Sequence, residues 1–354
     1  MSNKPGRKIL IAMIDSFTQE YFQASEMPNL REMVKNGFTK SVNAVMPTVT
    51  NVNNTSICTG APPSVHGITA NSYFDIASKE EKYMDRAELL LAPTIFEKAR
   101  EAGTKSALLT AKAKTIRLLK PGAELLLTAE EPTQEWVDKL GPAPDIYDYE
   151  INHWLFRAVH TIFKEQPEID LIYYHTTDCA MHFSDPMGEI SQKHLKGIDK
   201  GLGEILDDFP DMEVYLTGDH GMNYKSICYD LNKYMPEKGL EVFFAMSAER
   251  DPYIKHHRTF GGAAYVWLNQ PADYLKAKDI LLRTEGIEAV YTRYEAASLF
   301  DLHPDRIGDV MVLGDKATVF GPLDGAVEDL PKDFRTHGSL HEFTVPIIVY
   351  NSKV

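Results

Sequence analysis

Short apolar runs alternate with amphipathic stretches through the first two-thirds of the chain. The apolar runs have the length of buried strands, and the amphipathic stretches repeat apolar positions at helical spacing. This alternation predicts a mostly parallel α/β sheet flanked by helices. The predicted strands are Ile9–Ile14, Ser106–Leu109, Ile169–Tyr174, Glu213–Leu216 and Val345–Tyr350. The predicted helices are Pro28–Lys35, Thr94–Glu101, Tyr149–Lys164 and Glu189–Asp207.

A different pattern occupies residues 239–313. Ala263–Leu268 and Ile287–Thr292 have strand patterns, and helices are predicted near Ala272–Arg283 and Tyr294–Phe300. We interpret this segment as a small α+β cap. The catalytic core would then comprise residues 1–238 and 314–354.

Composition narrows the class of protein. The chain has 354 residues, of which 44% are hydrophobic and 25% are charged, as in soluble globular proteins. No apolar run reaches the roughly 18 residues of a membrane span, and Ile9–Ile14 is too short for a signal peptide. Three cysteines without a CxxC pair argue against a disulfide framework and a thiolate zinc site. We therefore expect a cytoplasmic protein without a membrane partner.

The charge distribution bears on the partners. The net charge of −14 argues against binding to a nucleic-acid polymer. Residues 102–123 are an exception, with five basic residues and no acidic one. Two of them, Lys112 and Lys114, follow the predicted strand that ends near Thr110, so they could hold a carboxylate at that sheet edge. The alternative interpretation is a solvated basic helix face.

Three aspartates, Asp15, Asp178 and Asp219, each follow the C-terminal end of a strand-like run. Sites in open α/β sheets are built at that edge. A single such aspartate is usually a helix N-cap. Three of them, with His182 and His220 close by in the sequence, indicate a site for divalent metal. Zinc suits these ligands best, and manganese or iron would also fit.

Two later histidines, His337 and His341, are further candidates. Their chemistry alone does not choose between them. With the residues above, they supply enough ligands for two metal ions that keep open positions for a substrate.

A hydroxyl-rich segment, Met46–Gly60, looks like a loop that enters a helix. Alone, Thr50 in this segment reads as a helix N-cap. A hydroxyl at a helix N-terminus is also well placed to become an alkoxide, because the helix dipole and a bound metal both stabilise negative charge.

The segments Pro47–Thr50, Ser56–Gly60 and Pro63–Ile68 resemble the nucleophile region of nucleotide pyrophosphatases/phosphodiesterases and phosphonoacetate hydrolases. These families belong to the alkaline phosphatase superfamily. The resemblance implies an alkaline phosphatase-like core with Thr50 as nucleophile. It also implies that Asn71, which stands at the matching spacing, helps to hold an oxygen of the transferred group.

The same resemblance implies two metal sites. The first set of ligands is Asp15, Asp219, His220 and the hydroxyl of Thr50. The second set is Asp178, His182 and His337. His337 matches better than His341, because the last ligand of the family is a histidine followed by glycine, with a Val-Pro pair further on.

The type of nucleophilic residue distinguishes the members of the superfamily from one another. The sulfatase pattern Cys/Ser-x-Pro-x-Arg does not fit Cys58–Pro62, and the serine of alkaline phosphatases and cofactor-independent phosphoglycerate mutases is replaced by Thr50. Thr110–Lys114 resembles the Ala-Lys-x-Lys element of phosphonoacetate hydrolases, whose lysines bind the substrate carboxylate. Ala92–Phe96, Asp251–His257 and Asp305–Asp309 also resemble that family.

The leading hypothesis is a two-metal hydrolase that cleaves phosphonoacetate to acetate and phosphate through a phosphothreonine intermediate. The alternatives are a phosphodiesterase or nucleotide pyrophosphatase, and a catalytically silent binding protein of the same fold. The expected partner is a small anionic phosphonate or phosphate ester, and the sequence allows a homodimer. His256 and His257 could reach the substrate from the cap or be structural.

Overall fold

The computed structural model describes residues 7–353, and the chain divides into two compact units. The first unit contains the described residues up to Asn43, Pro93–Asp219 and those from Thr344 onward. The second unit contains Ala44–Ala92 and His220–Phe343. The predicted cap, 239–313, lies within the second unit, and its separation from a core stays a prediction. Residues 1–6 and residue 354 lie outside the described residues.

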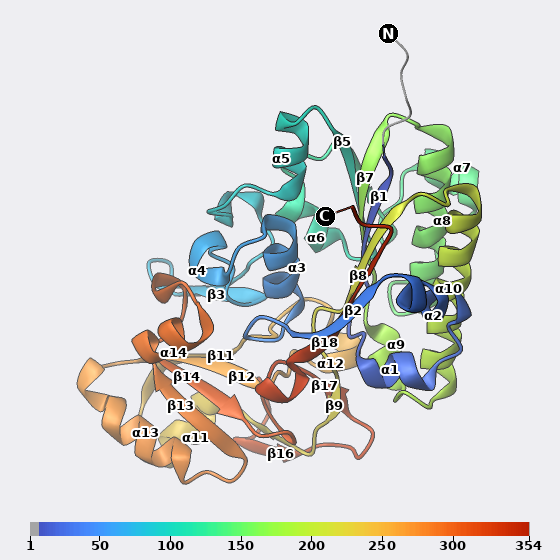
Figure 1. The fold of residues 1–354 in the computed structure, drawn as a ribbon. Helices are drawn as coiled ribbons and strands as arrows, with labels where there is room; N and C mark the ends of the chain where they lie inside the picture. Colours follow the sequence, from blue (N-terminus) through green and yellow to red (C-terminus); the bar gives the residue numbers. More distant parts are fainter. Residues whose placement is uncertain (1–6, 354) are drawn as a thin grey trace. The chain divides into compact units, whose positions relative to one another are not determined.

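A seven-stranded sheet forms the centre of the first unit (Figure 1). Five neighbouring strands, in the order β8, β1, β7, β5 and β6, are parallel, while β18 runs antiparallel to both β8 and β2. The strands are β1 (Ile9–Met13), β2 (Phe38–Asn43), β5 (Lys105–Thr110), β6 (Leu125–Thr128), β7 (Ile169–His175), β8 (Glu213–Thr217) and β18 (Thr344–Tyr350). The expected mostly parallel α/β sheet is therefore confirmed.

Helices cover both faces of this sheet, with α2, α7, α8 and α10 on one side and α5 and α6 on the other (Figure 1). The helices of the first unit are α1 (Gln19–Ala24), α2 (Pro28–Asn36), α5 (Ile95–Glu101), α6 (Ala113–Leu119), α7 (Gln134–Leu140), α8 (Glu150–Glu165), α9 (Cys179–Phe183) and α10 (Glu189–Asp208). Their apolar faces are buried, as Trp154 and Leu155 of α8 illustrate. Within residues 7–353, no helix combines the length and the apolar character needed to cross a membrane.

The second unit contains an antiparallel sheet in the order β11, β12, β14, β13. Its strands are β11 (Val242–Ser247), β12 (Ala263–Leu268), β13 (Ile287–Thr292) and β14 (Val310–Gly314), and α11 (Leu231–Glu237), α13 (Tyr274–Leu282) and α14 (Arg293–Phe300) pack beside them. The expected α+β elements are thus present. Val266, Val312 and Leu281 belong to the core of this unit.

The second unit also contains shorter helices and strands. They are α3 (Thr50–Thr59), α4 (Pro63–His66), α12 (Ile254–His257) and three small sheets, formed by β3 (Ser72–Asp75) with β4 (Glu80–Tyr83), by β9 (Asn223–Tyr224) with β17 (Arg335–Thr336), and by β10 (Ile227–Tyr229) with β15 (Thr318–Phe320) and β16 (Val327–Asp329).

The start of α2 is capped by a side chain from another helix. Its own N-cap residue, Met27, makes no side-chain cap bond. Instead, Asp199 of α10 accepts hydrogen bonds from the backbone N–H of Leu30 at 2.8 Å and of Asn29 at 3.2 Å. These are donors that a helix cannot satisfy internally, so one carboxylate satisfies the helix start and joins α2 to α10.

We expect Asp199→Ala to destabilise the protein by about 1–3 kcal/mol, because the backbone N–H groups of Asn29 and Leu30 lose a charged acceptor. Asp199→Asn keeps one acceptor oxygen and should cost less. Urea denaturation of both variants measures the difference. Equal stability of Asp199→Ala and the unsubstituted protein would contradict this account of the α2 cap.

Candidate active site

Three carboxylates of the first unit follow neighbouring strands. Asp15 comes after β1, Asp178 after β7 and Asp219 after β8, and β1 pairs with both other strands. All three residues are at most 1% exposed. Oxygens of Asp15 and Asp219 lie within 4.8 Å of each other, and Asp219 Oδ1 accepts from the N–H of Ser16 at 3.0 Å. The sheet order therefore concentrates negative charge at one edge, as the sequence predicted.

A buried cation follows β5, the strand beside β7, and lies at the same edge of the sheet. Lys112 Nζ lies 3.2 Å from Asp15 Oδ2 and 3.0 Å from Asp178 Oδ1. Lys112 thus bridges an aspartate from each predicted metal site, a contact that the sequence did not predict. Lys114 stands in the first turn of α6 and is 2% exposed, which does not fit the alternative of a solvated basic face.

Two histidines accompany these carboxylates. His182 of α9 has Nε2 2.9 Å from Asp178 Oδ2, one helical turn after that aspartate. His175 ends β7, with Nε2 3.5 Å from Asp15 Oδ2. Burial lowers the pKa of His175 despite the neighbouring carboxylate, so its imidazole is neutral near pH 7.

Thr50 opens α3 in the second unit. The N-cap is Val49 rather than Thr50, so the threonine hydroxyl is not the cap that a local reading of the sequence suggests. The rest of α3 is largely polar yet buried. Its polar side chains donate hydrogen bonds to backbone carbonyls one turn earlier in the helix. Asn54 donates to the carbonyl of Thr50 at 3.1 Å and Thr55 to that of Asn51 at 2.7 Å. These bonds remove the cost of burying a polar helix.

Asn71 lies beside the start of α3. Its Oδ1 accepts from the N–H of Asn51, the residue after Thr50, at 3.0 Å. This bond fixes the orientation of the amide. Its Nδ2 is buried and has no hydrogen-bond partner among residues 7–353. A buried donor of this kind, beside a helix N-terminus, suits an anionic oxygen.

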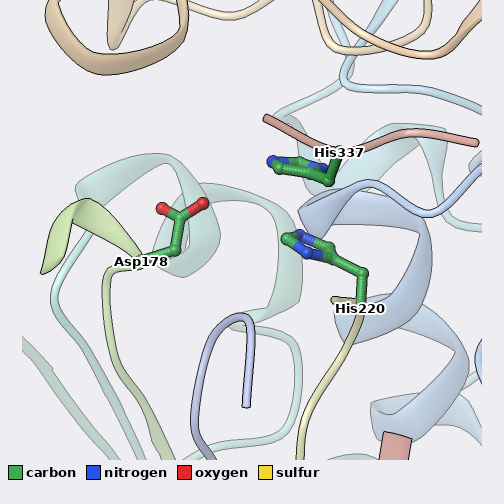
Figure 2. Close-up of side chains that lie close together, drawn as sticks. All are labelled: Asp178, His220 and His337. Carbon is green, nitrogen blue, oxygen red and sulfur yellow. The ribbon is translucent and has the colours of Figure 1, made fainter. Parts of the chain in front are cut away.

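His220 and His337 meet in the second unit (Figure 2). Their ring centroids are 3.6 Å apart and the planes differ by 15°. His220 Nδ1 lies 3.0 Å from the carbonyl oxygen of Gly221, and His337 Nδ1 lies 2.8 Å from that of Thr48. A carbonyl can only accept, so each Nδ1 carries the proton and each Nε2 keeps the lone pair that binds a metal.

The backbone around His337 requires a glycine. Gly338 has φ +110°, and a Cβ atom there would lie 2.7 Å from the nitrogen of Gly262. Gly262 N also donates to the carbonyl of His337 at 2.8 Å. The His-Gly pair noted in the sequence therefore has a steric basis.

Three further histidines of the second unit, the other candidates from the sequence, are placed differently. His341 Nε2 pairs with Glu288 at 2.6 Å, and the His341 side chain is 33% exposed. His257 Nδ1 accepts from the N–H of Thr259 at 2.9 Å, so Nε2 carries the proton and faces Asp251 at 3.3 Å. His256 is buried against the His257 ring. This placement favours His337 over His341 as a ligand and gives His257 a structural contact.

The donor types fit divalent metal ions. The first unit supplies buried carboxylates and His182, and the second supplies two imidazoles with the correct tautomer. Carboxylate oxygen with imidazole nitrogen is a donor set that zinc, manganese and iron all accept.

Residues 9–340 match the family type I phosphodiesterase / nucleotide pyrophosphatase. The chain belongs to this family. Its structure is similar to phosphonoacetate hydrolase from Sinorhizobium meliloti 1021 solved with phosphonoacetate, with a TM-score of 0.89 and 28% identity over 98% of this chain and 90% of that chain. The alkaline phosphatase-like fold expected from the sequence is confirmed.

Curated relatives of the family are longer. Venom phosphodiesterase of Naja atra is 24% identical over 261 residues, which cover 70% of this chain and 30% of the relative. Human ectonucleotide pyrophosphatase/phosphodiesterase family member 1 is 25% identical over 269 residues, covering 69% and 27%. The chain thus spans less than a third of the length of these two relatives.

Two residues near the predicted ligands escaped the sequence reasoning. His175 directly follows the predicted strand Ile169–Tyr174 and stands three residues before Asp178, and that position was the available signal. Glu249 Oε2 lies 3.5 Å from His337 Nδ1, but the two residues are distant in the sequence and no local pattern connects them.

We expect His337→Ala to reduce the metal content of the purified protein from about two ions per chain to about one, because it removes a buried ligand. His341→Ala is the matched control and should leave the content unchanged, since that ring pairs with Glu288. Elemental analysis after zinc loading measures both. Metal loss in His341→Ala alone would reverse the assignment.

Proposed function

We propose that this protein is a two-metal hydrolase that cleaves the carbon–phosphorus bond of phosphonoacetate. The observation that carries the proposal is the buried lysine pair, Lys112 and Lys114, after β5. Both lysines follow β5 at the sheet edge that carries Asp15 and Asp178, and a lysine there can hold the carboxylate of a substrate as a point charge. The likeness to phosphonoacetate hydrolase over nearly the whole of both chains supports the same substrate class.

The metal ligands that we propose are those implied by the resemblance. One ion would be held by Asp15, Asp219, His220 and the hydroxyl of Thr50. The other would be held by Asp178, His182 and His337. Such ions supply Lewis-acid chemistry, which lowers the pKa of a coordinated hydroxyl and stabilises charge on phosphoryl oxygens. We favour zinc, with manganese or iron as alternatives.

The chain's own groups then perform a double displacement. Thr50 Oγ1 would give up its proton to water and attack phosphorus, so that an O–P bond forms while the P–C bond breaks. The carbon keeps the electron pair, which spreads into the carboxylate as an enediolate that Lys112 and Lys114 would stabilise. Proton transfer from water to that carbon then yields acetate. Water then cleaves the phosphothreonine to release phosphate and restore Thr50.

Asn71 has a separate role in both displacements. Its Nδ2 group would donate to a non-bridging oxygen of the transferred group as negative charge builds there. A donor of this kind is typically worth about 100- to 1000-fold in rate.

A phosphodiesterase or nucleotide pyrophosphatase is the second candidate, favoured by the family match and by the curated relatives. It would use the same nucleophile and metal ligands but would not require the lysine pair. A catalytically silent binding protein would have no use for Thr50 and Asn71. A cytoplasmic location and a homodimer remain predictions from the sequence.

Lysine variants separate the two enzyme activities. We expect Lys114→Ala to reduce kcat/KM for phosphonoacetate by about 100-fold or more, while a nitrophenyl phosphodiester loses little, because only the phosphonate presents a carboxylate. Lys112→Ala should also damage the phosphonate more, with some loss for the diester because Lys112 contacts Asp15 and Asp178. Equal losses on both substrates for Lys114→Ala would remove it from carboxylate binding.

Thr50→Ala tests the nucleophile. Turnover of every substrate should fall to background, while the zinc content stays near that of the unsubstituted protein, because the hydroxyl is one ligand among several. Thr50→Ser should keep part of the activity. Mass spectrometry of the acid-quenched reaction should find phosphate on Thr50. Turnover that persists in Thr50→Ala would exclude a covalent intermediate at this residue.

A further inference from the structure

We infer that Glu342 is a positioning residue that sets the ligand nitrogens of both His220 and His337. The inference rests on the metal sites of the proposed function. Glu342 is 2% exposed and lies in the second unit with both histidines. Glu342 acts on the two imidazoles indirectly, through the peptide groups that contact their Nδ1 atoms.

The first connection runs to His220. The N–H of Gly221 donates to the backbone carbonyl of Glu342 at 2.7 Å, and the carbonyl of Gly221 is the group that His220 Nδ1 contacts. Gly221 thus contacts Glu342 through its N–H and His220 through its carbonyl. The carbonyl holds the imidazole proton on Nδ1, so Nε2 remains as the ligand atom. Asn223 Nδ2 adds a second bond, to Glu342 Oε1 at 2.7 Å.

The second connection runs to His337. Ser339 donates to Glu342 Oε2 through its N–H at 2.9 Å and its hydroxyl at 2.7 Å. The carbonyl of Ser339 accepts from the hydroxyl of Thr48 at 2.8 Å. The carbonyl of Thr48 is the acceptor for His337 Nδ1. Both carbonyls that set the tautomers are therefore linked to the same glutamate, one through Gly221 and the other through Ser339 and Thr48.

A buried cation keeps this glutamate ionised. Lys225 Nζ lies 2.9 Å from Glu342 Oε1 and also donates to the carbonyl of Lys316 at 3.0 Å. Burial raises the pKa of Glu342, but the Lys225 charge and the hydrogen bonds from Lys225, Ser339 and Asn223 outweigh it and lower the pKa to about 2. An ionised carboxylate offers four acceptor sites, enough for all these donors.

The strand pairing beside this glutamate supports the same role. β9 and β17 pair antiparallel, with Arg335 opposite Tyr224 and Thr336 opposite Asn223. The pairing brings the segment after His220 alongside the segment before His337, yet it spans only two residues on each side. The Glu342–Lys225 ion pair lies beside this short ladder. It adds a charged contact between the two segments, which the two backbone pairs alone do not provide.

The test compares cobalt binding in Glu342→Gln and the unsubstituted protein. Glutamine keeps the shape but removes the charge and one acceptor. We expect cobalt affinity to fall by about 10- to 100-fold, as for other groups that orient metal-binding histidines, and the visible absorption of bound cobalt to change. Chelator competition and absorption spectra measure these effects without an activity assay.

Asp309→Asn is the matched control. Asp309 also joins two elements of the second unit, because it accepts from Arg293 and from the N–H of Leu268, both at 2.8 Å. We expect a loss of thermal stability in this variant with an unchanged cobalt spectrum and affinity. Should Glu342→Gln not fold, Ser339→Ala decides, because it removes one bond to Glu342, keeps the Lys225 pair and should weaken cobalt binding in the same direction.

The outcomes separate the inference from the proposed function. An unsubstituted protein that binds no cobalt or zinc would overturn the metal sites, and the inference with them. Normal binding together with an unchanged spectrum and affinity in folded Glu342→Gln would overturn the positioning role alone. The positioning role also fails if Asp309→Asn shifts cobalt binding as much as Glu342→Gln does, since the effect would then be general destabilisation.

Discussion

Repulsion among three buried carboxylates is the constraint on which the first unit depends. Asp15, Asp178 and Asp219 follow adjacent parallel strands, so the sheet holds them at one edge away from bulk water. Like charges in such a medium repel strongly, and each also loses its hydration. The fold can keep them only if cations are present. Lys112, 3.0 and 3.2 Å from two of these carboxylates, supplies part of that compensation, and divalent ions are the natural source of the rest.

The second unit meets a different requirement. Imidazole binds a metal through a nitrogen without a proton, and which nitrogen that is depends on what the other one contacts. For His220 and His337 the deciding partners are backbone carbonyls, which accept only. Both histidines lie within the residues that match the family, and the carbonyl contacts leave Nε2 of each ring with the lone pair that a metal ligand needs.

Sequence patterns predicted the features that depend on local order. Each predicted strand and helix of the first unit agrees within one residue at either end, and the aspartates follow the strand ends that the pattern marked. The edge strand β2 was missed because nearly all of Phe38–Asn43 is exposed, which leaves no alternation to detect. The Lys225–Glu342 pair was missed for another reason. It joins residues 117 positions apart, and neither stands in a recognisable motif.

Charge balance connects the carboxylate cluster to the choice of substrate. In the proposed two-metal site, two divalent ions and two lysines against three aspartates would leave a formal charge of about +3 before Thr50 loses its proton. Fully ionised phosphonoacetate carries about three negative charges, whereas a phosphodiester carries about one. A site with this much positive charge would gain more from the trianion, and the two lysines would account for the difference. The sheet edge that carries the three aspartates would thereby suit the substrate that we propose, with a phosphonate at one end and a carboxylate at the other.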